Sequence, residues 1–130
     1  MRYRHPLTDR LFVLACAAGV AGAAACGPLH RGGTPPAYLY FTNESLDQAD
    51  VYASVGGNQP IRIGTVMAGK TDTLKVPPDI AARGENVNVI ARVLAHSGAV
   101  ASGPVPIHPG DRLSVRLPID QKLLVVLPGS

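Results

Sequence analysis

The sequence contains little that could stabilise a fold through aromatic packing or covalent cross-links. Its 130 residues include no tryptophan, four tyrosines, two phenylalanines and only two cysteines. A shortage of aromatic rings excludes a core built on them and predicts one packed from aliphatic side chains. Both cysteines, Cys16 and Cys26, precede the region that we assign to the folded domain, so no disulfide is expected within it.

An excess of basic charge is also missing from most of the chain. The formal net charge is +3, from 12 Lys and Arg against 9 Asp and Glu. The first 25 residues hold three arginines and one aspartate, which leaves a net charge of only +1 for the remainder. Nucleic-acid-binding domains usually carry a clustered basic surface, and we therefore expect no nucleic-acid partner.

No segment is long enough to span a membrane as a helix. The longest apolar run, Leu11–Ala25, has 15 residues, whereas a transmembrane helix needs about 20. The run follows a basic stretch that contains Arg2, Arg4 and Arg10, and it ends in small residues. This organisation is typical of a secretory signal peptide. The sequence therefore predicts a cleaved signal helix over residues 1–25 and an exported protein.

The end of this leader, Ala23-Ala24-Ala25-Cys26, resembles the lipobox of bacterial lipoproteins. The resemblance covers the leader only, and it departs from the usual pattern at Ala23, where leucine is commoner. It implies cleavage between Ala25 and Cys26, a diacylglyceryl group on the Cys26 thiol, and an acyl chain such as palmitate on the new amine. Lipidation would also remove a lone thiol from an oxidising compartment. Two alternatives remain open: ordinary signal cleavage at the same bond, and an earlier lipobox at Val13–Cys16.

Residues 26–36 would then comprise the lipidated cysteine and a flexible tether rich in glycine and proline. The expected partner is accordingly a membrane, held through the lipid anchor. In lipoproteins of bacteria with two membranes, an aspartate after the cysteine often retains the protein in the inner membrane. Gly27 stands there instead, which implies anchorage in the outer membrane, facing the periplasm or the cell surface.

Residues 37–130 predict a single all-β domain, because short apolar or alternating runs are separated by turn residues. Seven or eight short strands favour a small antiparallel β-sandwich of immunoglobulin-like or transthyretin-like architecture. We expect 86–95 and 122–127 in sheet centres, since they are apolar on both faces. We expect 99–105 at an edge, since proline removes a ladder donor. The predicted strands are 37–42, 51–55, 61–66, 71–76, 86–95, 99–105, 112–117 and 122–127, and 78–83 could form one helical turn.

Three tyrosines are the candidate ligand-binding residues. Tyr38 and Tyr40 lie two positions apart, so they share one face of their strand. Tyr52 could sit opposite them on a neighbouring strand. Exposed tyrosines could stack on sugar rings, whereas buried ones would pack in the core or at its rim.

No set of residues matches a catalytic or metal-binding motif. His96 and Ser97 are neighbours in a glycine-containing turn, and with Asp111 they lack the sequence context of a hydrolase triad. His30, His96 and His108 fall in separate loops without a cysteine nearby. We therefore expect no catalytic residues, no metal and no cofactor.

The sequence favours a membrane-anchored, non-enzymatic module with a structural or protein-binding role. The alternative is a carbohydrate-binding module of the cell envelope that uses the tyrosines. The apolar run 122–127 could act as an adhesive strand for a protein partner if it lay at a sheet edge, although we expect it in the core.

Overall fold

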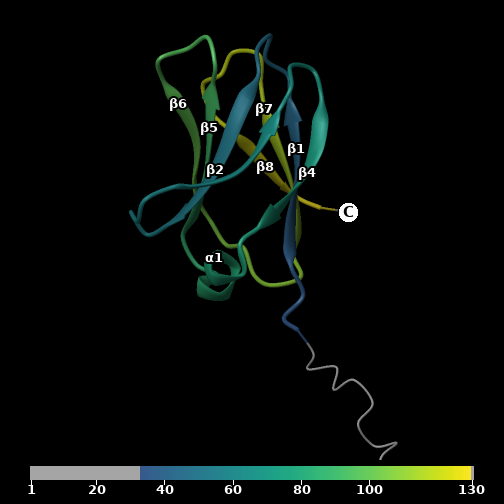
Figure 1. Ribbon diagram of the computed structural model, residues 1–130, viewed down its shortest axis with the longest axis vertical. Coiled ribbons are helices and arrows are strands. Elements are labelled where there is room, and N and C mark those ends of the chain that lie inside the picture. The colour runs from purple at the N-terminus through teal and green to yellow at the C-terminus, as the bar shows by residue number, and fades with distance from the viewer. Residues whose placement is uncertain (1–32, 130) are drawn as a thin grey trace, which may run out of the picture. The chain divides into compact units, whose positions relative to one another are not determined.

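The computed structural model describes residues 33–129. Residues 34–129 form one compact unit, in which two four-stranded sheets face each other (Figure 1). Sheet A has the strand order β4-β1-β7-β8, and sheet B has the order β3-β2-β5-β6. The predicted all-β sandwich is therefore confirmed. The predicted signal peptide, its cleavage site at Ala25 and the lipidation site at Cys26 lie outside the described residues.

The helix and the strands begin and end close to the turn residues of the sequence. The only helix among residues 33–129 is short, and none there is long and apolar enough to cross a membrane. The elements are β1 (Ala37–Asn43), β2 (Ala49–Val55), β3 (Ile61–Val66), β4 (Thr71–Val76), α1 (Pro78–Arg83), β5 (Val87–Val93), β6 (Ala99–Val105), β7 (Arg112–Leu117) and β8 (Val125–Pro128).

The alternation of side chains along β1 shows how the sequence forms the sandwich. Ala37, Leu39 and Phe41 are fully buried, whereas the residues between them are only half-buried. Successive strand residues point to opposite faces, so β1 directs one set into the core and the other to the outer surface. Phe41 is the only aromatic residue in the core that the structure describes. The core is otherwise aliphatic, as the composition predicts.

Strand β5 lies in the centre of sheet B and β6 at its edge, as the sequence predicts. Pro104 lies in β6, and the pairing of β5 with β6 shifts register between Asn88 and Ile90. At this irregularity the backbone N–H of Val89 donates to Oγ of Ser102 at 3.0 Å. A side-chain hydroxyl thus accepts a hydrogen bond where the ladder between the two backbones is interrupted.

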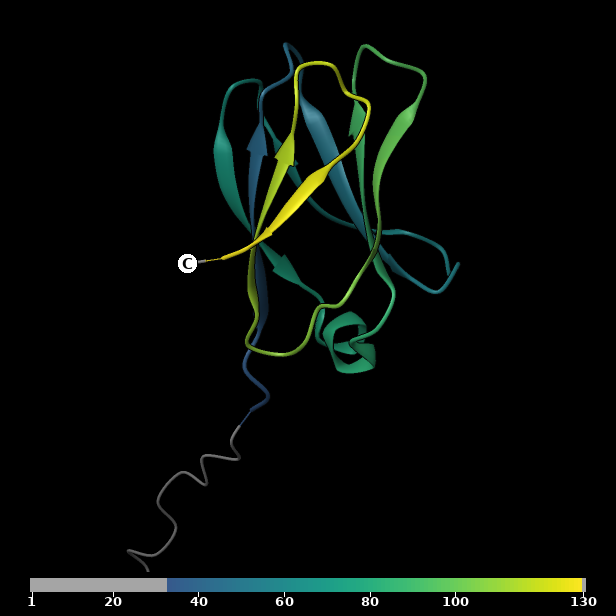
Figure 2. The ribbon, with the colours of Figure 1, turned by 180° about the vertical axis from the view of Figure 1, so that it is seen from behind.

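The expectation that 122–127 lies in a sheet centre is wrong. Strand β8 is short and lies at the edge of sheet A, beside β7 (Figure 2). The other side of β7 is already paired with β1, in parallel, which leaves β8 only the outer position. Of the predicted strand, Leu124 is buried, whereas Leu123 and Leu127 are exposed. An apolar run without clear alternation does not by itself distinguish a central strand from an edge strand.

A proline removes one backbone hydrogen-bond donor from the free edge of β8. The N–H of Gly129 donates to the carbonyl of Arg112 at 2.8 Å, and Leu113 is the register partner of Pro128. Hydrogen-bonded and non-hydrogen-bonded residue pairs alternate along an antiparallel ladder. Because Gly129 is hydrogen-bonded to β7, the N–H and C=O positions of Val126 and Pro128 face the free edge instead. Pro128 has no N–H to offer there, and β8 is therefore a poor template for an added strand.

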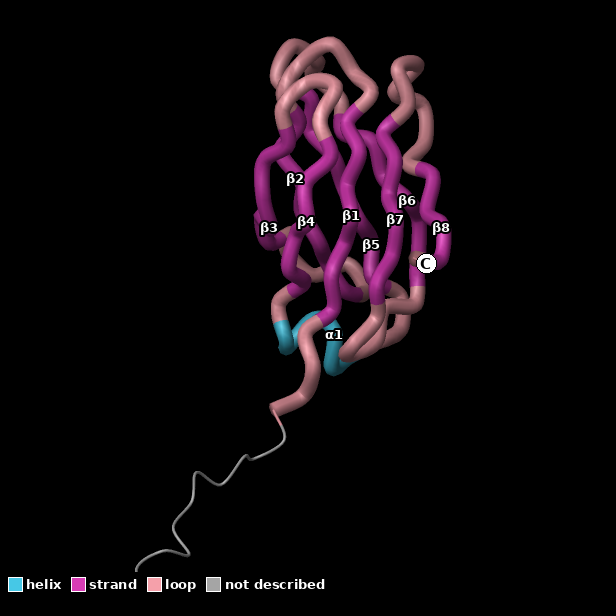
Figure 3. Tube along the Cα trace, turned by 90° about the vertical axis from the view of Figure 1, so that its right-hand side faces the viewer, coloured by secondary structure: helices cyan, strands magenta, loops and turns pink. Residues whose placement is uncertain are grey.

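The strands run between two ends of the sandwich that differ in structure (Figure 3). We call one the helix end, because it carries α1 and the point where the chain enters β1. We call the other the loop end. The loop end consists of the connections β1–β2 (44–48), β3–β4 (67–70), β5–β6 (94–98) and β7–β8 (118–124).

Candidate binding surface

The loop end carries most of the large apolar side chains that the described residues expose. Seven such side chains are exposed, and five of them belong to the four connections of the loop end. Their exposed fractions range from 56% to 80%. Single exposed apolar residues are common on proteins, but their concentration at one end marks a candidate binding surface. We call these five residues the apolar tips: Leu46, Met67, Leu94, Ile119 and Leu123.

The first of these connections is held by a buried asparagine at the end of β1. Nδ2 of Asn43 donates to the carbonyls of Asp47 at 2.9 Å and Val66 at 3.0 Å. Its Oδ1 accepts from the backbone N–H of Ser45 at 3.0 Å and from the Ser45 hydroxyl at 2.6 Å. Its main-chain carbonyl accepts from Gly69 at 2.8 Å. Every polar group of this buried side chain is used, so the loop that presents Leu46 is held in one conformation.

Backbone hydrogen bonds join this loop to strands of both sheets. The N–H of Leu94, just after β5, donates to the carbonyl of Gln48 at 2.9 Å. The N–H of Glu44 donates to the carbonyl of Leu117, the last residue of β7, at 2.9 Å. The apolar tips therefore stand on connected rather than independent loops.

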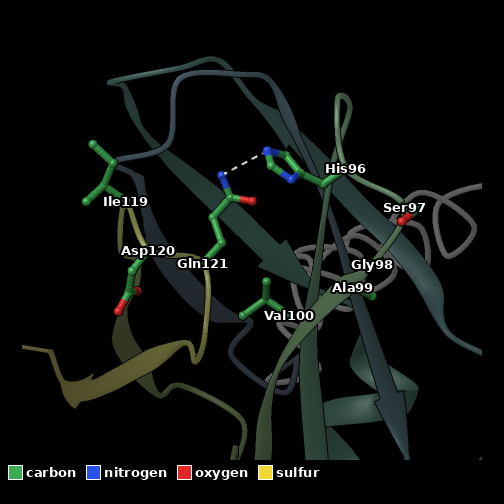
Figure 4. A pocket seen from close by; sticks show the side chains of 8 residues that line it. All are labelled: His96, Ser97, Gly98, Ala99, Val100, Ile119, Asp120 and Gln121. Carbon is green, nitrogen blue, oxygen red and sulfur yellow. Dashed lines mark hydrogen bonds between the residues drawn. The ribbon is translucent and has the colours of Figure 1, made fainter.

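A shallow cleft of about 330 Å³ lies between the β5–β6 and β7–β8 connections (Figure 4). Nε2 of Gln121 lies 3.4 Å from Nε2 of His96 across the cleft, and Gln121 has a positive φ of 51°. The volume is at the lower end of the range for small-molecule pockets. The cleft is lined by both polar and apolar residues, which could contact a single side chain of a protein. The lining residues are His96, Ser97, Gly98, Ala99, Val100, Ile119, Asp120 and Gln121.

The three candidate tyrosines do not come together. Tyr38 and Tyr40 both lie half-buried on the outer face of sheet A, as their spacing predicts. Tyr52 lies half-buried on β2, on the outer face of sheet B, so the expectation that it sits opposite the other two is wrong. The reason is that the connection from β1 to β2 crosses from one sheet to the other, which places Tyr52 on the far side of the sandwich.

Side chains of the protein itself contact the ring of Tyr52 and form ion pairs on the surface beside it. The guanidinium of Arg92 lies 5.2 Å from the centroid of the Tyr52 ring, a cation–π distance. On the same face Arg62 pairs with Asp50 at 2.8 Å, and the Thr65 hydroxyl donates to the same carboxylate at 2.8 Å. The cations on this face are therefore engaged by groups of the protein itself.

His96 and Ser97 lie far from Asp111 in the sandwich, whereas His108 lies beside it. His96 and Ser97 belong to the loop end, whereas Asp111 precedes β7 at the helix end. There the Asp111 carboxylate accepts from the backbone N–H of His108 at 2.7 Å. In residues 33–129 no group of three or more His, Cys, Asp and Glu is placed to hold a metal ion. His30 lies outside the described residues.

No protein-family model matches this sequence, and no curated protein matches it. The candidate binding surface therefore rests on the exposure and position of its own residues. Sequence reasoning named Tyr38 and Tyr40 as candidates but did not single out the apolar tips. Leu94 and Leu123 fall within predicted strands, and the other three lie in or beside turns. The isolated Leu46 within the polar stretch 43–48 was the one available signal.

Proposed function

We propose that the chain is a lipid-anchored protein of the cell envelope whose β-sandwich is a non-enzymatic, protein-binding module. The observation that carries the proposal is the cluster of apolar tips at the loop end. A chain gains nothing in folding from large apolar side chains that stay in water, so a contact outside the domain is a physical reason to present them.

The surroundings of the tips favour a protein over a charged membrane surface as the partner. The connections of the loop end carry acidic and basic residues in a mixture, without a basic excess: Glu44, Asp47, Lys70, Asp120 and Lys122. Apolar positions with a polar rim are typical of protein–protein interfaces. Binding to anionic lipid would be favoured by clustered lysine and arginine instead.

The internal hydrogen bonds of the β1–β2 connection support the same kind of partner. Asn43 and the backbone bonds around it fix the β1–β2 connection before any partner arrives. A pre-organised surface loses less conformational entropy on binding than a mobile one does. The chain enters the domain at the helix end, the end of the sandwich opposite the apolar tips.

The anchor is tested by the intact mass of the protein extracted from membranes of its native host. We expect a chain that begins at Cys26 and carries a diacylglyceryl group and an acyl chain. The variant Cys26→Ser should lose the lipid mass and leave the membrane fraction. A native product that still begins at Met1 and remains in the cytosol would contradict the proposal.

The binding surface is tested by placing a photo-crosslinking residue in the full-length protein in the native host. We expect a crosslinker at Leu46 or Ile119 to give the same discrete protein adduct. A crosslinker at Gln59, an exposed position in the β2–β3 connection at the helix end, is the matched control and should give none. Adding Leu94→Ser should weaken the adducts at both loop-end positions, because all three residues belong to one surface.

Two results would contradict the protein-binding proposal. Adducts at Gln59 that equal those at Leu46 would show that the loop end is not selective. Adducts at Leu46 and Ile119 that consist only of lipid would mean that the tips enter a bilayer.

A further inference from the structure

The outer face of sheet A combines two tyrosine rings with cations on both sides. Tyr38 on β1 has Lys75 of β4 and Arg112 of β7 as its register partners. Lys75 and Arg112 are exposed, and Tyr38 is half-buried. Adjacent strands lie about 4.8 Å apart, so the three residues form one short row across the sheet with the ring between the two charges.

The next row repeats the aromatic residue with hydroxyls in place of the cations. Tyr40 has Thr73 of β4 and Ser114 of β7 as its register partners. Two residues along a strand span roughly 6.8 Å, so the two rings lie side by side along β1. The face thus offers two aromatic rings, two hydroxyls and two cations on three adjacent strands.

In the described part of the chain, Lys75 and Arg112 differ from the cations of sheet B in having no ion-pair partner, whereas Arg116 at the far end of β7 pairs with Glu44. Among residues 33–129, neither Lys75 nor Arg112 makes a salt bridge. On sheet B, by contrast, Arg62 pairs with Asp50, and Arg92 lies over the ring of Tyr52. Within the described residues, sheet A therefore presents two cations without a salt bridge beside two half-buried tyrosine rings, whereas both arginines of sheet B are engaged.

We infer that the outer face of sheet A binds an acidic polysaccharide through Tyr38, Tyr40, Lys75 and Arg112. Sugar rings are flat and partly apolar on their faces, so they stack on tyrosine rings. The acid groups of the polymer pair with Lys75 and Arg112, the latter able to hold a carboxylate through two parallel hydrogen bonds. Thr73 and Ser114 supply hydroxyls for the sugar hydroxyl groups.

The test measures binding of the purified full-length protein to polygalacturonate, with neutral dextran and inorganic polyphosphate as comparison probes. We expect binding to polygalacturonate to be at least about tenfold tighter than to dextran. Tyr40→Ala and Arg112→Glu should each weaken it by about tenfold, which corresponds to the loss of one good contact. About 1 M NaCl, where the Debye length is about 3 Å, should remove most of the preference for the acidic polymer.

Sheet B supplies matched controls with the same residue types on the opposite face. Tyr52→Ala and Arg92→Glu should leave polygalacturonate binding within about twofold of the parent protein. Leu46→Ser should do the same, so a failure of this inference is distinguishable from a failure of the loop-end proposal. Circular dichroism of each variant shows whether the sandwich is intact.

Three outcomes would overturn the inference. The first is no binding to polygalacturonate, or equal binding to dextran. The second is binding to polyphosphate as tight as to polygalacturonate and unaffected by Tyr40→Ala, which would reduce the face to a nonspecific basic patch. The third is an equal loss of binding in Tyr52→Ala and Tyr40→Ala.

Discussion

The two ends of the sandwich differ in how many of their apolar connecting residues they bury. At the helix end, Ile80 and Ala81 of α1 and Ile107 of the β6–β7 connection are folded inward, with exposed fractions of 4%, 2% and 0%. At the loop end, Leu46 and Leu94 are 80% and 74% exposed. Both ends close the same core, so the requirement to cover that core does not explain the difference.

The helix end shows that the connections of this chain can bury their apolar residues. It does so with a six-residue helix and a hydrogen bond from the N–H of Ile107 to the carbonyl of Gly84 at 2.9 Å. At the loop end, hydrogen bonds hold the backbone of the β1–β2 connection, while the five apolar tips are exposed and Leu124 is buried. The residues of the helix end contribute to stability, and the proposed partner would contact the loop end.

The largest expected effect is at the helix end. Ile107→Ala should lower the free energy of unfolding by roughly 2–5 kcal/mol, because it removes a fully buried side chain and leaves a cavity. Urea denaturation of the purified protein measures this change. Ile107→Val should lose only about 0.5–1.5 kcal/mol. A loss below about 1 kcal/mol for Ile107→Ala would mean that the helix end does not seal the core.

The next effect is at the buried asparagine beneath the loop end. Asn43→Ala should lower the free energy of unfolding by roughly 1–3 kcal/mol, because the carbonyl of Val66 and the polar groups of Ser45 lose their partner. Hydrogen exchange should also become faster at the amide of Ser45. Asn58→Ala, at an exposed asparagine of the β2–β3 connection, should change stability by less than about 0.5 kcal/mol.

A smaller change in stability is expected at the apolar tips themselves. Leu46→Ser should alter the free energy of unfolding by no more than about 0.5 kcal/mol, because the leucine side chain is already in water. Thermal and urea unfolding should therefore resemble those of the parent protein while the loop-end crosslink weakens. A strong destabilisation by Leu46→Ser would instead give this residue a role in the fold.

The smallest expected effect is at the ion pair between the β1–β2 connection and β7. Nη1 of Arg116 lies 3.4 Å from Oε1 of Glu44, and both side chains are about half exposed. Arg116→Ala should lower the free energy of unfolding by less than about 0.5 kcal/mol. Any difference should vanish in about 1 M NaCl, because exposed charges are screened there. A larger loss that persists in salt would show that this pair, and not Asn43, holds the loop.

The strands could be predicted from sequence because glycine, proline and asparagine mark their ends. The bounds of β3, β4, β6 and β7 agree with the predicted ranges residue for residue. The central position of β5 and the edge position of β6 also followed from local features, namely apolar residues on both faces and Pro104. Strand ends and these two positions depend on residues close in sequence, so they can be predicted from the sequence.

The errors concern properties that depend on distant parts of the chain. The edge position of β8 follows from the pairing of β7 with β1, and the separation of Tyr52 from Tyr38 follows from a crossover between sheets. The exposure of Leu46 depends on the turn that Asn43 fixes. Neither strand order nor loop conformation is encoded in the spacing of apolar residues, so the exposure of the apolar tips could not be predicted from the sequence.

The most direct test of the account is hydroxyl-radical footprinting of the loop end in the native envelope and in the purified protein. Leu46 and Met67 represent the loop end, and Ile61, also exposed, lies at the other end as an internal control. We predict that Leu46 and Met67 react several times more slowly in the envelope, whereas Ile61 reacts equally in both samples. Equal reactivity of all three residues in both samples would show that nothing covers the loop end and would contradict the account.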